Sequence, residues 1–267
     1  MMKFAVGVEY DGSCYHGWQR QKNTPQTVQE KLESALSVLA SSPVFVVCAG
    51  RTDAGVHALE QVVHFETSKQ RELHQWVFGT NANLPDDIRV VWIKPVTEDF
   101  HARFSAAARY YRYEILNRWV KSALSRHHVT TIFNPLDENL MQKGANYLLG
   151  THDFTSFRAQ ACQAKSPVKH IHSIVIKRID DKIIIDIIAN AFLHHMVRNI
   201  VGTLLPVGTG ERPPEFVHHA LKAKDRRQAG VTALPNFKGV YYPEAFGLDN
   251  LEAFSPFSDA IEKNRAK

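Results

Sequence analysis

Strand-like and helix-like periodicity alternates along the 267 residues, and it does so in the same order twice. The N-terminal part follows the order strand, helix, strand, strand, helix, strand, and the C-terminal part repeats this plan loosely. Two βαββαβ-like halves predict an α+β fold in which antiparallel sheets carry their helices on one face. We place the boundary near residue 105, so that the halves comprise residues 1–105 and 106–267.

In the N-terminal half, apolar runs predict four strands at residues 4–10, 44–49, 61–66 and 88–93. A helix is expected after Thr27, because Thr27 and Glu30 have the spacing of a capping box and Pro25 lies just ahead of them. Apolar residues then recur at helical spacing as one stripe, formed by Val28, Leu32, Ala35, Leu36 and Leu39. Residues 71–81 form the second predicted helix.

In the C-terminal half, a strand is predicted at residues 109–116 and a helix at residues 136–149, which ends at Gly150, a typical residue after a helix. Residues 171–179 and 182–189 have the pattern of a hairpin around Asp180 and Asp181. A further helix is expected from residue 192 to about residue 207.

The strand predicted at residues 44–49 leads into a loop in which Asp53 lies between Gly50 and Gly55. Glycines let a backbone bend where a substrate must come close. An Asp held there by a rigid strand is a candidate nucleophile or base, and Arg51 is a candidate anion contact. Asp and Gly are also ordinary turn residues, so the residue types alone leave a purely structural loop open.

The helix predicted from residue 192 is apolar nearly all round, which indicates burial. Val201 and Leu205 flank Arg198 on the side opposite the main apolar arc. A buried guanidinium is costly unless it pairs with an anion, and Asp53 is the nearest functional candidate for that anion. An Arg partner would keep the carboxylate ionised. A surface Arg whose stem lies along apolar residues is the alternative.

Composition limits the classes of protein that this chain can represent. No apolar run approaches the ~20 residues of a membrane span, and the first residues lack the apolar core of a signal peptide. Three cysteines are too few for a disulfide framework or a Cys-based zinc site, so we expect a cytoplasmic protein. The net charge is +5, and basic residues alternate with aromatic ones between residues 103 and 126. Such a mixture suits RNA, and a solvated basic face is the alternative.

Four motifs resemble those of the tRNA pseudouridine synthase A family, and they occur in the family's order between residue 3 and about residue 205. The signature of that family is similar to residues 50–58, GRTDAGVHA. Its first strand and Gly-rich turn resemble residues 10–21, YDGSCYHGWQRQ, and its central tyrosine motif resembles residues 108–113, ARYYRY. Its C-terminal helix, which carries a catalytic-site arginine, resembles residues 192–202, FLHHMVRNIVG.

This resemblance implies a fold and an activity. The fold consists of two ferredoxin-like or RRM-like halves joined edge to edge in a continuous, mostly antiparallel sheet, with helices on one face and an RNA-binding cleft on the other. The activity is isomerisation of uridine to pseudouridine at positions 38, 39 and 40 of the tRNA anticodon stem-loop. The family acts on that arm usually as a homodimer, and the reaction requires no cofactor.

The resemblance also implies roles for individual residues. Asp53 is the catalytic aspartate, which acts as a nucleophile on the uracil ring or on the sugar, or assists a glycal route. Tyr111 stacks on the base and takes a proton from C5 or from the sugar, and Arg198 holds Asp53 in place. Because the target base must leave its stack, Arg51 is expected to fill the vacated space or hold a phosphate. Arg20 is a further expected RNA contact.

The match weakens towards the C-terminus. Residues 232–241 look shorter than the family's last turn and strand, and Val240 replaces the usual Leu. We expect this segment, with Val240, to form the last wall of the uracil pocket.

Three other functions were considered. The paired histidines at residues 127–128, 194–195 and 218–219 suggest a metal, but neighbouring side chains on a helix or strand point different ways, and no metal site is predicted. A retaining glycosidase needs two close carboxylates, whereas the catalytic motifs here supply Tyr and Arg beside Asp53. A non-catalytic tRNA-binding protein or RNA chaperone remains the main alternative.

Overall fold

The computed structural model of this chain describes residues 1–235 and 237–240. The first half has the predicted order of elements. It consists of β1 (Met2–Tyr10), α1 (Val28–Ala40), β2 (Val47–Cys48), β3 (His57–Thr67), α2 (Leu73–Asn83) and β4 (Ile88–Val96). Short 3-10 turns cover Gly12–Cys14, Thr155–Phe157 and Arg226–Gln228.

The second half contains the predicted strand, helix and hairpin together with elements that periodicity did not predict. The predicted ones are β5 (Arg109–Asn117), α3 (Glu138–Asn146), β8 (Val168–Ile179), β9 (Lys182–Ala189) and α4 (Met196–Gly208). The additional ones are β6 (Thr130–Ile132), β7 (Gly150–Asp153), α5 (Glu215–Ala223) and β10 (Phe237–Val240). None of the described helices is long and apolar enough to cross a membrane.

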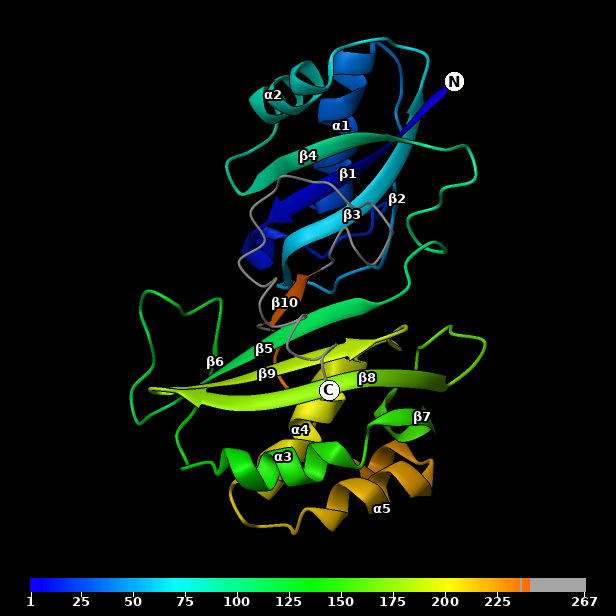
Figure 1. Cartoon of the computed structure of the whole chain (residues 1–267). Coiled ribbons are helices and arrows are strands. Elements are labelled where there is room, and N and C mark those ends of the chain that lie inside the picture. The colour runs from blue at the N-terminus through cyan, green and yellow to red at the C-terminus, as the bar shows by residue number, and fades with distance from the viewer. Residues whose placement is uncertain (236, 241–267) are drawn as a thin grey trace, which may run out of the picture.

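All the strands belong to one ten-stranded sheet with the order β4-β1-β3-β10-β5-β9-β8-β7, in which β2 also pairs with β3 and β6 with β5 (Figure 1). The pairs are antiparallel except β10 with β3 and β5 with β6. The predicted α+β fold with a continuous, mostly antiparallel sheet is therefore confirmed. The joint is β10, a strand that the sequence pattern did not predict.

The two halves repeat one strand order. In the first half, the strands lie in the order β4-β1-β3-β2, and in the second half β10-β5-β9-β8 lie in the corresponding order. β10 is thus the last strand of the second βαββαβ unit. One edge of β3 pairs with β2 near Val63 and with β10 near Ala58. The last strand of the second unit therefore joins the first unit along the edge of β3 that β2 leaves unpaired.

The helices lie on one face of the sheet. Phe4, Val6 and Val8 of β1 pack in one cluster with the apolar stripe of α1 and with Trp76 of α2. Tyr111 and Tyr113 of β5 pack in a second cluster with α4. Gly239 lies opposite Ala58 on one side and Tyr111 on the other, so the register carries the same face across the joint. In Figure 1, α1 and α4 both pass behind the strands.

The start of α1 agrees with the predicted cap. Thr27 Oγ1 accepts a hydrogen bond from the Glu30 amide, at 3.4 Å. The Glu30 carboxylate pairs with Arg20, at 2.5 Å. The helix therefore begins where the sequence predicted, and its first acidic side chain holds the preceding loop.

The buried strand predicted at residues 44–49 is wrong in extent, because the ladder covers only Val47 and Cys48. Val44 and Val46 are buried, whereas the side chain of Phe45 is 70% exposed. The Val46 amide donates to the carboxylate of Glu33 on α1, at 3.0 Å. This segment therefore packs against α1, and the Glu33 side chain accepts a backbone hydrogen bond that a neighbouring strand would otherwise accept.

Two helix boundaries also differ from the predictions. α3 ends at Asn146, earlier than predicted. Gly150, which has a φ of +89°, is not the residue that follows the helix but the first residue of β7. The helix predicted from residue 192 begins only at Met196, because His195 adopts the left-handed region with a φ of +61°. A turn precedes the helix instead, closed by a hydrogen bond from the Met196 amide to the Leu193 carbonyl at 3.0 Å.

Candidate active site

Asp53 lies on the loop between β2 and β3, and the end of β1 holds this loop. The Thr52 hydroxyl bonds to the Tyr10 hydroxyl at 2.7 Å, and the Trp18 amide donates to the Thr52 carbonyl at 3.0 Å. Gly17 has a φ of +91°, and a Cβ there would lie 2.7 Å from that same carbonyl. The glycine in the first motif therefore allows the two loops to pack backbone against backbone.

Three side chains surround the Asp53 carboxylate. Arg198 Nη1 lies 3.6 Å from one carboxylate oxygen, so the predicted pairing of Arg198 with Asp53 is confirmed. His194 Nε2 and His195 Nε2 lie 3.4 Å and 3.3 Å from its two oxygens. The Asp53 side chain is 28% exposed, so substrate can still reach a carboxylate that is held from one side.

The turn before α4 explains why adjacent histidines both face one carboxylate. The expectation that His194 and His195 point different ways is wrong, since their ring centroids lie 4.0 Å apart. The positive φ of His195 reverses the chain just before the helix, and the His194 carbonyl accepts the Ala159 amide at 2.9 Å. The adjacent histidines were the feature of the sequence that could have indicated this site. The apolar periodicity predicted one continuous helix from residue 192, and such a helix has no turn at His195.

Burial sets the protonation of His195. Loss of hydration lowers the pKa of His195, and the nearby His194 and Arg198 act in the same direction, whereas Asp53 alone opposes them. His195 is therefore neutral at neutral pH.

Arg198 contacts both Asp53 and the C-terminal segment of the described chain. Its side chain is 17% exposed, and Nε donates to the Ala233 carbonyl at 2.7 Å. The Ala233 amide donates back to the Arg198 carbonyl at 3.1 Å. The α4 helix is buried over most of its surface, as its apolar pattern predicted, so the guanidinium finds its partners inside the fold.

Tyr111 lies on β5 beside the same turn. Its ring is 7% exposed and meets the edge of Phe192 at a centroid distance of 4.9 Å. Phe192 stands two residues before His194, and Tyr111 packs in one buried cluster with Val56, which follows the Asp53 loop, and with Val197 of α4. The structure therefore gathers the three motifs of Asp53, Tyr111 and Arg198 into one region.

Tyr110 and Arg112 lie on the opposite face of β5, because successive side chains of a strand alternate between its two faces. The Arg112 guanidinium and the Tyr110 hydroxyl both bind the carboxylate of Asp186 on β9, at 2.7 Å and 2.5 Å. These two residues therefore have a structural partner outside the candidate site, which leaves Tyr111 as the tyrosine next to Phe192.

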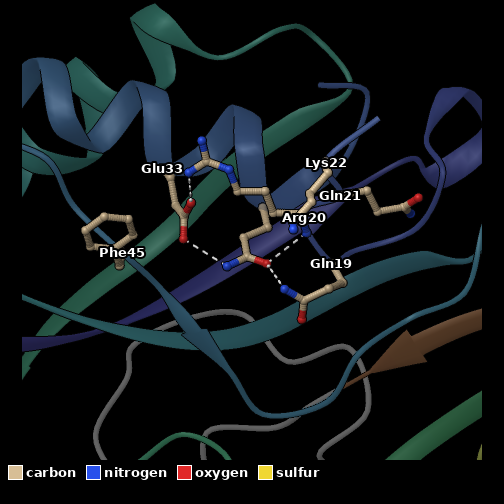
Figure 2. A pocket seen from close by; sticks show the side chains of 7 residues that line it. Gln19, Arg20, Gln21, Lys22, Glu33 and Phe45 are labelled. Atoms are coloured by element: carbon tan, nitrogen blue, oxygen red, sulfur yellow. Dashed lines mark hydrogen bonds and ion pairs between the residues drawn. The ribbon is translucent and has the colours of Figure 1, made fainter. Parts of the chain in front are cut away.

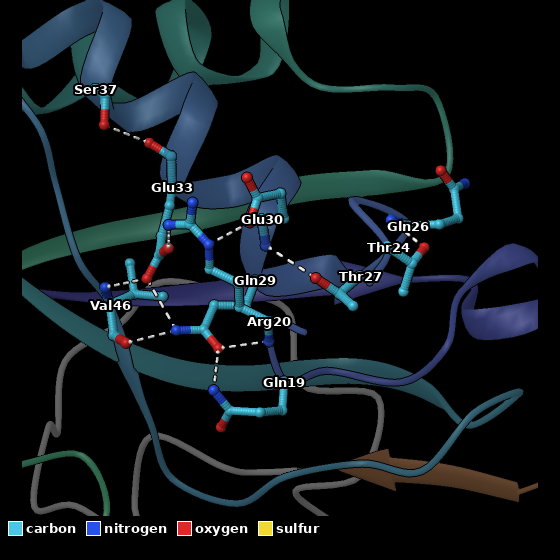
Figure 3. A network of polar contacts seen from close by, with 10 residues as sticks. All are labelled: Gln19, Arg20, Thr24, Gln26, Thr27, Gln29, Glu30, Glu33, Ser37 and Val46. Atoms are coloured by element: carbon cyan, nitrogen blue, oxygen red, sulfur yellow. Dashed lines mark hydrogen bonds and ion pairs between the residues drawn. The ribbon is translucent and has the colours of Figure 1, made fainter. Parts of the chain in front are cut away.

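The two predicted RNA contacts have different surroundings. Arg51 is exposed beside Asp53. Arg20 binds the carboxylates of Glu30 and Glu33 on α1, at 2.5 Å and 3.3 Å. Figures 2 and 3 show its guanidinium turned towards α1, where a shallow pocket is lined by the residues around it. That Arg20 contacts RNA stays a prediction. In the structure, its guanidinium pairs with two carboxylates of α1.

The predicted wall residue Val240 lies in β10. The backbone of this strand passes between β3 and β5, with Val240 opposite Tyr110 and Gly239 opposite Tyr111. Residues 236 and 241 of the atypical segment 232–241 lie outside the described residues. The strand thus runs directly beside the tyrosine motif, which is where a wall of the pocket would be needed.

Two groups bring potential metal ligands together. Asp11, His57 and His128 form one, and Asp53, His194 and His195 form the other, with ligand atoms within 4.8 Å of one another in each. In the first group, His57 Nδ1 accepts the Gly12 amide at 3.1 Å, so its lone pair is already used. In the second, the carboxylate has Arg198 as a cationic partner. The absence of a metal stays a prediction.

Comparison with known proteins supports the four motifs. The model of a family described as tRNA pseudouridine synthase matches residues 7–105 and 145–243. A protein of Pseudoalteromonas atlantica is 55% identical over 256 residues, which cover 94% of this chain and 96% of the relative. Relatives from Coxiella burnetii and Colwellia psychrerythraea are 52% and 54% identical and also align over nearly their whole length. All three are named tRNA pseudouridine synthase A.

Proposed function

This chain belongs to the tRNA pseudouridine synthase family and is an isomerase of uridine in tRNA, and we propose that Asp53 is its catalytic nucleophile. The family resemblance of the sequence motifs and the assignment as an enzyme are both confirmed by the comparisons. The role of Asp53, the uridines that are modified and the other site residues belong to the proposal.

The observation that carries the proposal is the environment of Asp53. A carboxylate attacks as an anion, and the Arg198 guanidinium lies 3.6 Å from one oxygen of the Asp53 carboxylate. His195, which burial keeps neutral, adds a polar contact without a second positive charge that would weaken the nucleophile. The group is partly exposed on one side and held by three residues on the other.

The reaction rearranges bonds within one nucleotide. The bond from uracil N1 to C1′ breaks, the base turns, and a bond from C5 to C1′ forms. The proton leaves C5 and N1 gains one, so the reaction is balanced without a redox partner or water. Asp53 bonds transiently to the uracil ring or to the sugar, or assists a glycal route, and all three courses need its negative charge.

Tyr111 and Arg198 complete the catalytic set in this proposal. Tyr111 stacks on the turned base and receives the proton that leaves C5 or the sugar, a role that suits its position on β5 beside Phe192. Arg198 holds Asp53 and links it to Ala233. Val240, on the strand next to Tyr111, closes the uracil pocket.

The substrate of the proposal is the anticodon arm of tRNA, with uridines 38, 39 and 40 as targets and a homodimer as the acting species. The base must leave its stack to reach Asp53. Arg51, exposed two residues away, occupies the space left behind or binds a phosphate. Arg20 contacts the RNA from the first Gly-rich turn.

Tritium release tests the role of Asp53. tRNA labelled at uracil C5 loses tritium when the C5–C1′ bond forms, so we expect release by the wild type and none by Asp53→Asn, a loss on the order of a thousandfold or more. The matched control is Asp86→Asn, because the Asp86 side chain is fully exposed on another loop. Transcripts that retain uridine only at position 38, 39 or 40 define the target positions.

Two results would contradict the proposal. Full release by Asp53→Asn would exclude Asp53 as the nucleophile. Tight tRNA binding by the wild type with no release at all would instead support the alternative of a tRNA-binding protein without catalysis.

A further inference from the structure

The loop between β5 and β6, residues 118–128, exposes large apolar side chains. The side chain of Trp119 is 86% exposed and that of Leu124 is 94% exposed. The three other tryptophans of the chain, Trp18, Trp76 and Trp92, are all buried. Figure 1 shows this green loop projecting beyond the left-hand ends of β5 and β6.

The same loop carries positive charges. Lys121 and Arg126 are both exposed, and within the described part of the chain neither forms an ion pair with a carboxylate. Arg118 lies 3.7 Å from Asp181 and holds its own loop through a bond from Nε to the Val120 carbonyl at 2.8 Å. The loop therefore combines the exposed indole of Trp119 with two cationic side chains that form no ion pair in the described part of the chain. A third cation, Arg118, is partly engaged by Asp181.

The end of the loop is fixed next to the catalytic loop. The His57 ring bonds to the His127 carbonyl at 2.8 Å, and the His128 ring stacks on His57 with centroids 4.3 Å apart. His128 also lies 3.3 Å from the carboxylate of Asp11. His57 is the first residue of β3 and follows Asp53 by four positions. These contacts hold the C-terminal end of loop 118–128 against the start of β3, the strand that follows the Asp53 loop.

We propose that loop 118–128 is an RNA-binding element, in which Trp119 stacks on an unpaired base of the substrate and Lys121 and Arg126 contact neighbouring phosphates. Aromatic stacking combined with basic side chains is how proteins bind unpaired RNA. Interfaces between protein chains are instead depleted in Lys, so the charges favour a polyanion over a second copy of this chain. The inference rests on the proposed function, since it concerns the same tRNA substrate.

Trp119 itself reports on the proposed contact, because it is the exposed tryptophan among four. Added tRNA should quench its fluorescence and protect it from acrylamide. Trp119→Phe should abolish this signal while binding, followed by filter retention, stays close to that of the wild type. Trp119→Ala should weaken binding about tenfold, because the base loses its stacking partner.

Two further variants complete the experiment. The double variant Lys121→Gln, Arg126→Gln should lower the slope of log K against log salt by about two, one for each phosphate contact. Phe78→Ala is the matched control, because Phe78 is an aromatic residue 72% exposed on α2. In steady-state tritium release, Trp119→Ala should raise KM and leave kcat within about twofold, since the loop does not touch the reacting atoms.

Three outcomes would overturn the proposal. One is unchanged tRNA affinity of Trp119→Ala. A second is an unchanged salt slope in the double variant. The third is a Trp119→Ala protein whose molar mass in solution falls while its tRNA affinity is kept, which would assign the loop to an interface between copies. Failure of the proposed function gives a different result, because it would appear in tritium release, either as no release by the wild type or as full release by Asp53→Asn, whereas the loop is tested by tRNA affinity and its salt dependence.

Discussion

Asp53 shows how one carboxylate can be held in place by side chains from another part of the chain. Arg198 supplies charge, the histidine pair supplies two polar contacts, and the turn at His195 aims all three. Such preorganisation matters because a group that is already in place needs no rearrangement when the substrate arrives. The opposite side of Asp53 stays accessible.

Another histidine, His64, has a role in stability. His64 on β3 is 7% exposed, and its Nδ1 accepts the Ala102 amide at 3.1 Å. Burial lowers the pKa of His64 to about 4, and His101 and Lys3 act in the same direction. This neutral histidine links the first half to the segment that leads into β5.

The pKa of His64 predicts a loss of stability in acid. The folded chain binds fewer protons there than the unfolded chain, whose histidine pKa is about 6.5, so the free energy of unfolding decreases as the pH falls from 6.5 towards 4. The expected decrease from this group between pH 7 and pH 5 is about 2 kcal/mol. His64→Asn, whose side-chain oxygen can accept the Ala102 amide, should lack it in urea unfolding. His74→Asn, at an exposed site on α2, serves as the control, and an equal acid loss in all three proteins would disprove the assignment.

At the scale of the elements, α4 is the support on which the site is built. Its first turn positions the partners of Asp53, and its middle packs against residues 229–233. A Cβ at Gly202 would lie 1.6 Å from the Val231 carbonyl oxygen, so this glycine lets the segment cross the helix at close range. The crossing in turn places the Ala233 carbonyl where Arg198 binds it.

Gly202→Ala is therefore expected to lift this segment from α4. The loss in free energy of unfolding should be about 1–3 kcal/mol, and tritium release should fall because Arg198 loses its anchor. Thermal unfolding and activity measure the two effects. Gly208→Ala is the control in the same helix, because its Cβ would meet the flexible side chain of Met141. Equal behaviour of the two variants would show that the close approach at Gly202 has no special importance.

At the scale of the whole molecule, β10 joins two repeated units into one sheet. Lys238 pairs with His57 of β3 on one side and with Arg112 of β5 on the other. Since β4 ends at Val96 and β5 begins at Arg109, we propose that the units divide near residue 105, between these two strands. The chain crosses from one unit to the other there, and within the described residues β10 then brings it back beside β3.

A proline in β10 should uncouple the units. Lys238→Pro removes a backbone donor from a strand with neighbours on both sides and leaves its acceptor unsatisfied, at a cost of about 1–3 kcal/mol. We expect calorimetry to resolve two unfolding transitions in this variant and one in the wild type. Lys238→Thr keeps the donor and is the control. A single transition at the wild-type temperature in the proline variant would mean that β10 contributes little to the joint.

The sequence alone determined most of the elements and the catalytic candidates. β1, β3 and the β8–β9 hairpin follow from alternation between neighbouring residues, and the cap at Thr27 follows from a four-residue pattern. Asp53, Tyr111 and Arg198 were named from contiguous motifs, and burial of α4 from its apolar surface. Each of these signals is local, which is why it can be recognised without the fold.

Only the tertiary structure decided how these parts meet. The facing of His194 and His195 onto Asp53 depends on one left-handed residue, which periodicity does not register. The strand β10 has no pattern of its own and exists because β3 and β5 leave an edge free between them. Loop 118–128 lies beside the catalytic loop through contacts to His57, far away in the chain. Contacts between distant residues depend on packing of the whole chain, so the local pattern of residues cannot contain them.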